Sequence, residues 1–193
     1  MSLVMFLSEP IVARVVRAGR VGLLALALSA GAAAPMWGVS VATADQATAD
    51  EDQVKAAFLF NFARFVEWPP PSTGPLVIGV VSDDAFAKTL ERLVRDRTVD
   101  QRPVVMRRLR AGDDPATCHV LYIAGSPRER AAEILRRCSG PILTVGDTVQ
   151  FLRDGGIIRF HTEDKRVRFQ INRDNATAAG LKISSHLLKL ASQ

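Results

Sequence analysis

The chain has 193 residues, of which 48% are hydrophobic and 23% are charged, and its formal net charge is +5. A chain of this length can bury a sizeable core, which excludes a small scaffold that depends on many disulfides. Its basic residues are scattered rather than clustered, which argues against a nucleic-acid-binding protein.

The first 44 residues have the three parts of a secretory signal: a charged start, an apolar run and a small-residue cleavage site. The apolar run over residues 21–30 has ten residues, short of the about 20 that an uncleaved membrane anchor would need. We expect cleavage between Ala44 and Asp45, with residues 32–34 as a second candidate site. The mature chain, residues 45–193, would then form one domain. The charged start of the signal carries Arg14, Arg17 and Arg20, the apolar run follows, and Ala42-Thr43-Ala44 is the cleavage site.

Removing this segment also takes away three arginines and Glu9, which lowers the net charge from +5 to +3. The high sequence pI is therefore partly a property of the signal. An exported protein does not meet DNA, so we expect no nucleic-acid partner. No cysteine lies near the cleavage site, so we expect no lipoprotein anchor.

Residues 51–68 predict the first helix of the mature chain. Glu51 or Asp52 would begin it, because acidic side chains suit a helix N-terminus, and the prolines at 69–71 cannot continue it. Its apolar residues recur at helical spacing and form one face. Phe60 and Trp68 lie towards the flanks of that face. Either they belong to a core helix, or they stay partly exposed for a partner.

Short apolar runs then alternate with helical segments. Strands are predicted over 76–81, 104–107, 120–124 and 141–145. The predicted helices are one over 84–95 capped by Ser82 or Asp83, one to residue 137 with Ser126 as its cap and Pro127 first, and a short one through Val149, Phe151 and Leu152. This alternation predicts an α/β fold: a three-layer, mostly parallel sheet flanked by helices, with right-handed crossovers.

Residues 155–172 read as an antiparallel hairpin, with residues 162–165 making the reversal. A period of two puts apolar residues on one face and polar residues on the other. The polar face carries Arg159, His161, Arg166, Arg168 and Gln170. It is either a solvated outer face or a basic recognition surface. After a polar segment over 173–180, leucine spacing predicts a closing helix that begins at Ser184 or Ser185.

The two cysteines lie at corresponding ends of one strand–helix unit. Cys118 precedes the third strand, and Cys138 follows the helix that returns from it. A strand's start and the following helix's end lie at the same edge of a sheet, so we expect a disulfide between them. Two buried free thiols are the alternative.

We find no sequence motif for catalysis, and we expect no cofactor and no metal. Asp83-Asp84 after the first strand is similar to the acidic pocket of response-regulator receivers, but two acids before a helix are typical of caps. His119, His161 and His186 are far apart in sequence and carry no ligand spacing.

Four segments of the chain resemble the YfiR family of small periplasmic regulators. They are VKAAFLFNFARFVEWP (54–69), PLVIGVVSDD (75–84), CHVLYI (118–123), and residues 142–188, which include ILTVGDTVQFLRDGGIIRF, VRFQIN and AGLKISSHLL. Together they span nearly the whole mature chain.

The resemblance implies a repressor without enzymatic activity. It would bind the periplasmic sensor domain of an inner-membrane diguanylate cyclase, or another membrane sensor, and hold it inactive. It further implies a homodimer that responds to redox state through disulfides, and sequestration by an outer-membrane OmpA-like lipoprotein. This chain has one cysteine pair where the best-known pattern has two.

We therefore expect a periplasmic regulatory binding protein. A small-molecule-binding sensor or solute-binding-like module is the alternative, and an enzyme is a third possibility. For the partner surface, aromatic and arginine anchors are the usual choice. The candidates are Phe60, Trp68, Phe151, Arg159, His161, Arg166 and Arg168.

The first prediction concerns export. We expect the protein to fractionate with the periplasm and to begin at Asp45, because the signal ends in Ala42-Thr43-Ala44. N-terminal sequencing of the fractionated protein checks this. An intact Met1 on a cytoplasmic protein would contradict it.

Overall fold

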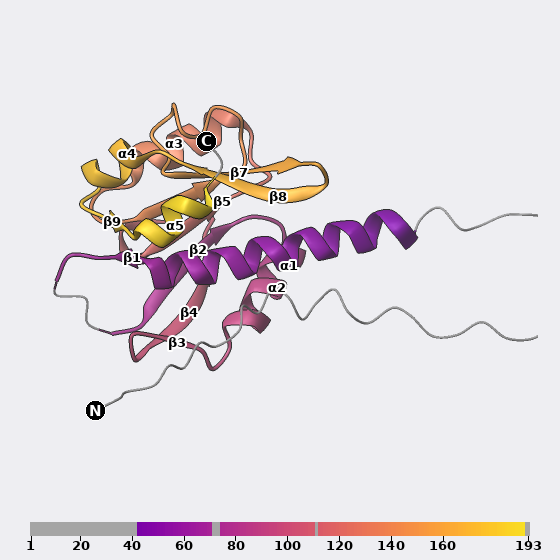
Figure 1. Ribbon diagram of the computed structural model, residues 1–193, viewed down its shortest axis with the longest axis horizontal. Helices are drawn as coiled ribbons and strands as arrows, with labels where there is room; N and C mark the ends of the chain where they lie inside the picture. The colour runs from indigo at the N-terminus through magenta and orange to yellow at the C-terminus, as the bar shows by residue number, and fades with distance from the viewer. Residues whose placement is uncertain (1–41, 71–73, 111, 192–193) are drawn as a thin grey trace, which may run out of the picture. The chain divides into compact units, whose positions relative to one another are not determined.

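The computed structural model describes residues 42–70, 74–110 and 112–191 of the chain. They form an α/β fold with a curled, mostly parallel sheet, as the sequence predicts (Figure 1). The strands are β1 (Val66–Glu67), β2 (Leu76–Val81), β3 (Thr98–Val99), β4 (Arg102–Arg108), β5 (Val120–Ile123), β6 (Leu143–Gly146), β7 (Ile158–Glu163), β8 (Arg166–Ile171) and β9 (Lys182–Ile183). The helices are α1 (Ala42–Phe65), α2 (Asp84–Val94), the 3-10 helix η2 (Pro115–Thr117), α3 (Arg128–Arg137), α4 (Arg173–Ala178) and α5 (Ser185–Leu190).

The main sheet has the strand order β3-β4-β2-β5-β6-β7-β8. The five strands from β4 to β7 pair in parallel, and the two edge strands β3 and β8 pair antiparallel with their neighbours. Strand β2 lies between β4 and β5. The chain first goes from β2 to β4 on one side of it and then crosses to β5 on its other side. This is the order of flavodoxin-like sheets.

Side chains alternate between two cores on the two faces of the sheet. Ile78 and Tyr122 belong to the larger core, which α1, α2, α4 and α5 help to cover. Leu121 and Ile123, which flank Tyr122 in sequence, belong to the smaller core under α3. Strands that are buried on both faces read as continuous apolar runs, which is why their prediction succeeds.

Helix α1 begins at Ala42, nine residues before the predicted start, and ends at Phe65 rather than at Trp68. The residues of its first part, 46–50, are exposed, so no apolar periodicity marks them in the sequence. The rest of α1 buries Leu59 and Phe62 and packs along α2. Residues 1–41 of the predicted signal, which spans 1–44, lie outside the described residues, and α1 includes the predicted cleavage site.

Two predicted helix caps have different outcomes. Asp83 caps α2 as expected, because its carboxylate accepts a hydrogen bond from the Phe86 N–H at 2.9 Å. Ser126 does not cap α3, which begins one residue later than predicted. Pro127 takes the cap position, and no side chain caps the first turn.

The helix predicted through Val149, Phe151 and Leu152 is not formed. Residues 148–155 are a series of turns, in which the Phe151 N–H donates to the Thr148 carbonyl at 3.0 Å. The Phe151 ring is fully buried between Gly146 and Gly156. A Cβ atom at either glycine would overlap this ring. These two glycines therefore make room for an aromatic side chain, whereas Gly155, with φ +103°, supplies the turn.

The hairpin forms with the predicted faces. Asp164 and Lys165, both with positive φ, make a two-residue turn, so the first strand extends two residues further than predicted towards the tip, whereas the second begins at Arg166 as predicted. Ile158 lies opposite Ile171, and Phe160 lies opposite Phe169, on the apolar face. Rings of α1 cover that face, with the Phe62 centroid 5.7 Å from Phe160 and 5.0 Å from Phe169.

The C-terminal segment closes the larger core. Helix α5 begins at Ser185, and Ser184 caps it by accepting from the Leu187 N–H at 3.2 Å, as predicted. Strand β9 pairs antiparallel with β1, which directly follows α1. Neither α4 nor these two-residue strands is predicted from the sequence, because pieces this short show no periodicity.

The fit of Phe151 against Gly146 generates the second prediction. Gly146→Ala should destabilise the protein by about 1–3 kcal/mol, because the new methyl group overpacks the ring. Phe151→Ala alone should cost about 3–5 kcal/mol. Denaturant unfolding of the two single variants and the double variant measures their coupling.

In the Phe151→Ala background, Gly146→Ala should be nearly neutral, because its methyl group then occupies vacated space. Gly112→Ala is the control, since nothing lies within 4 Å of a Cβ atom there, and it should change stability by less than about 0.5 kcal/mol. Additive costs in the double variant would contradict the proposed packing.

Candidate partner-binding surface

The polar face of the hairpin gathers side chains from both of its strands. Arg159 lies opposite Gln170, and its Nη2 donates to Gln170 Oε1 at 2.9 Å. Arg159 also donates to the carbonyl of Val149 at 3.3 Å, which links the hairpin to the turns before it. His161 lies opposite Arg168. The structure therefore brings together the four hairpin residues that we singled out from the sequence.

An acidic residue moderates the charge of this face. Glu163, which the sequence predicts in the turn, lies on β7 opposite Arg166 of β8. Its carboxylate is 4.0 Å from Arg168 Nε. All three side chains are exposed, so their pairing contributes little to stability. Near the tip the strands thus present two exposed arginines against one exposed glutamate, next to the exposed turn residues Asp164 and Lys165.

His161 is half-buried, and its Nδ1 atom has no hydrogen-bond partner among the described residues. Because this nitrogen is itself buried, it is not accessible to a partner, and only the exposed part of the ring contributes to the face.

The three aromatic candidates do not join this surface. Phe60 is 7% exposed in the larger core, where the Arg97 guanidinium stacks 5.2 Å from its ring centroid, and Phe151 is fully buried. Both side chains are therefore unavailable for contact in this structure. Trp68 is half-buried, and its ring lies 5.9 Å from the ring of His119, which directly precedes β5. The hairpin tip lies at the other end of the strands.

The surroundings of Trp68 form a polar cluster that sequence reasoning missed. His119 Nδ1 accepts from the Val77 N–H at 3.2 Å, and Arg102 Nη2 lies 2.8 Å from His119 Nε2. Burial and the nearby Arg102 charge lower the pKa of His119. Arg102 also donates to the carbonyl of Gly74 at 2.8 Å, so the cluster fastens the segment before β2 to β4. Single residues spread over 50 positions give no spacing signal for such a cluster.

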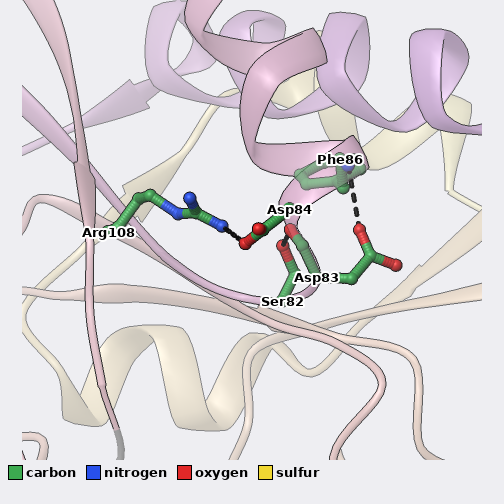
Figure 2. Close-up of polar contacts among 5 residues, drawn as sticks. All are labelled: Ser82, Asp83, Asp84, Phe86 and Arg108. Carbon is green, nitrogen blue, oxygen red and sulfur yellow. Dashed lines mark hydrogen bonds and ion pairs between the residues drawn. The ribbon is translucent and has the colours of Figure 1, made fainter.

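The two acids after β2 have structural partners. Asp83 is the cap of α2, and Asp84 forms an ion pair with Arg108 from the end of β4 (Figure 2). Within residues 42–70, 74–110 and 112–191, we find no group of three or more histidine, cysteine or acidic side chains placed to hold a metal. The cap interpretation therefore holds for Asp83 alone, because Asp84 pairs with Arg108 instead.

Cys118 and Cys138 are free thiols in the structure, and the bridge between them stays a prediction. Both belong to the smaller core; Cys118 is buried, and Cys138 is half-buried and donates to the Ile134 carbonyl at 3.4 Å. Burial raises the pKa of both thiols, that of Cys138 to about 11. The charge of the Cys118 thiolate is the second cause for Cys138.

A comparison with protein families decides the kind of protein. The YfiR/HmsC-like family model matches residues 52–192. The chain belongs to this family. No curated protein matches the chain. YfiR/HmsC-like membership supports, at family level, a periplasmic regulator of a diguanylate cyclase rather than an enzyme. Among the described helices, none combines the length and apolarity needed to cross a membrane.

The third prediction concerns the two thiols. Protein isolated without reductant should carry no free thiol after unfolding, because an oxidising compartment permits the bridge. Closing this loop should stabilise the fold by about 3 kcal/mol. Alkylation under denaturing conditions followed by mass spectrometry checks the bridge. Two thiols that are alkylated only after unfolding would contradict it.

The pH dependence of stability provides a matched control. In reduced protein, the pKa of Cys138 is raised from 9.0 to about 11 by folding, so the unfolded chain loses its proton first. The stability that this thiol contributes is present below pH 9 and is lost as the pH rises through about 11. Bridged protein has no such thiol, and its unfolding free energy should lack this loss.

Proposed function

We propose that this protein is a periplasmic repressor that binds the periplasmic sensor domain of an inner-membrane diguanylate cyclase and holds the cyclase inactive. The observation that carries the proposal is the match to the YfiR/HmsC-like family over residues 52–192. The exposed polar face of the hairpin supports it, because a protein that acts by binding needs a fixed and accessible surface.

The hairpin is well suited to this role. Its apolar face packs against Phe58 and Phe62 of α1, which holds both strands in place beneath the polar side chains. A surface that is already ordered loses little conformational entropy on binding. Arg166 and Arg168 are exposed, and arginine is one of the residues that most often anchor interfaces. An acidic patch on the sensor domain would be complementary to them.

Further partners follow from the same proposal. We infer that an outer-membrane OmpA-like lipoprotein relieves repression by sequestering the protein, and that the repressor acts as a homodimer. Both inferences rest on the family resemblance, and size-exclusion chromatography with light scattering measures the oligomeric state directly.

One observation favours the alternative of a small-molecule sensor. A hollow of about 400 Å³ lies between α4, β9 and α5, within the range of ligand pockets. Two basic and several apolar side chains line it, which suits an amphipathic anion. The lining includes Arg173, Thr177, Leu181, Lys182, Ile183 and Leu188.

The fourth prediction tests the hairpin surface. The double variant Arg166→Glu/Arg168→Glu should lower the capture of the cyclase from solubilised inner membrane by about 30-fold or more, as loss of interface anchors does. The captured protein is identified by mass spectrometry through its GGDEF output domain. The free energy of unfolding should change by less than about 0.5 kcal/mol, because both side chains are exposed.

The matched control is Arg130→Glu/Arg136→Glu, which makes the same charge change at two exposed positions of α3. It should leave capture unchanged. Equal capture by the hairpin variant and the native chain would remove this face as the repressor's contact surface.

A further inference from the structure

Strand β4 lies near one edge of the main sheet and is only partly covered. Its neighbour β3 pairs with it at Arg102 and Pro103 alone, through a two-residue turn at Asp100 and Gln101 that has positive φ at both positions. One more bond follows, from the Val104 N–H to the carbonyl of Arg97 at 2.9 Å. Before Arg97 the chain leads away into α2, so no described strand pairs with the remainder of β4 on that side.

The backbone groups at this open edge can be assigned from the ladder. Leu109 N–H donates to the Val80 carbonyl of β2 at 2.9 Å, whereas the Val104 N–H points the other way, to β3. Backbone direction alternates along a strand, so the N–H and C=O groups of Met106 and Arg108 point outward. No described residue makes a backbone hydrogen bond to either of them across this edge.

The side chains along this edge change from apolar to basic on both faces of the strand. On one face, Val105 is 40% exposed and Arg107 is exposed, with the neutral hydroxyl of Thr117 as its hydrogen-bond partner. On the other face, Met106 is half-buried, and Arg108 reaches Asp84 (Figure 2).

The exposure of Val105 has a topological cause. In this strand order the connection from β4 to β5 passes over the face that carries Val105. The described part of that connection contains the three-residue η2 and no α-helix, and α3 covers the face further along, over Leu121 and Ile123. The edge is therefore accessible from the side and from this face.

We propose that residues 105–108 of β4 bind an extended acidic segment of a partner protein by strand addition. The segment would continue the sheet by hydrogen bonding to Met106 and Arg108, which is the usual way that an exposed sheet edge recognises a peptide. Opposite-charge and apolar cross-strand pairs then set its sequence. Two apolar residues followed by two acidic residues fit in a parallel orientation, and the reverse order fits in an antiparallel one.

A second copy of this chain is a poorer occupant than an acidic segment. Pairing β4 with itself would bring Arg107 and Arg108 of both copies into one short ribbon, and like charges across strands are destabilising. The edge lies at the opposite side of the sheet from the hairpin. The proposal is thus independent of the repressor function, and the two surfaces could be occupied together.

Synthetic ten-residue peptides test this directly. One carries Val-Val-Glu-Glu at its centre, one carries Glu-Glu-Val-Val, and a third has the same composition in scrambled order. Fluorescence anisotropy with the purified full chain measures affinity, and amide hydrogen exchange followed by NMR locates the contact. One of the first two peptides should bind at least tenfold more tightly than the scrambled one and should slow exchange at Met106 and Arg108.

Variants decide whether charge selects the segment. Arg107→Glu should weaken binding of the preferred peptide at least tenfold, and replacing the peptide's glutamates by lysines should restore it, which also shows that the variant is folded. Arg130→Glu on α3 is the control and should bind the original peptide like the native chain. Equal binding of the scrambled peptide, binding without protection of Met106 and Arg108, or protection of these amides by self-association would overturn the proposal.

Discussion

Four phenylalanine rings connect the first helix of the described chain to its last long strands. Phe58 and Phe62 of α1 meet Phe160 and Phe169 of the hairpin at centroid distances of 5.0–6.0 Å, in stacked, tilted and edge-to-face arrangements. Such ring pairs stabilise by more than the area that they bury. The hairpin's polar face can be a fixed surface only because this contact, made between segments about 100 positions apart, holds the reverse side of both strands.

The two faces of the sheet are covered unequally, and this places accessible groups at its edges. The larger core is closed by α1, α2 and the C-terminal elements, whereas the smaller core depends on α3 and the turns that carry Phe151. Where short connections replace helices, strand residues such as Val105 remain exposed. The exposed arginines of the two proposed binding surfaces accordingly lie along β4 and β8, next to one edge of the main sheet and at the other, rather than on its central strands.

The sequence predicts the helices and strands in which burial of one face produces a regular pattern of apolar residues. It misses the features that depend on contacts between distant parts of the chain. The hairpin faces follow from alternation, because one side must be covered and the other need not be. Phe151 has the spacing of a helix, yet its ring fits only between two glycines that are brought together by folding. For Phe60, the sequence does not show which side of α1 faces Arg97, because α1 has apolar residues on several sides. The open edge of β4 is likewise invisible in sequence, since it depends on where β3 ends.

The pairing of β1 with β9 joins the end of α1 to the last ten described residues. Ser184 N–H donates to the Phe65 carbonyl at 2.9 Å, and Leu181 and Leu187 fill the same core as Phe62. A ribosome supplies these residues last. The core around α1 therefore cannot close completely until residues 181–187 have left the ribosome and packed against it.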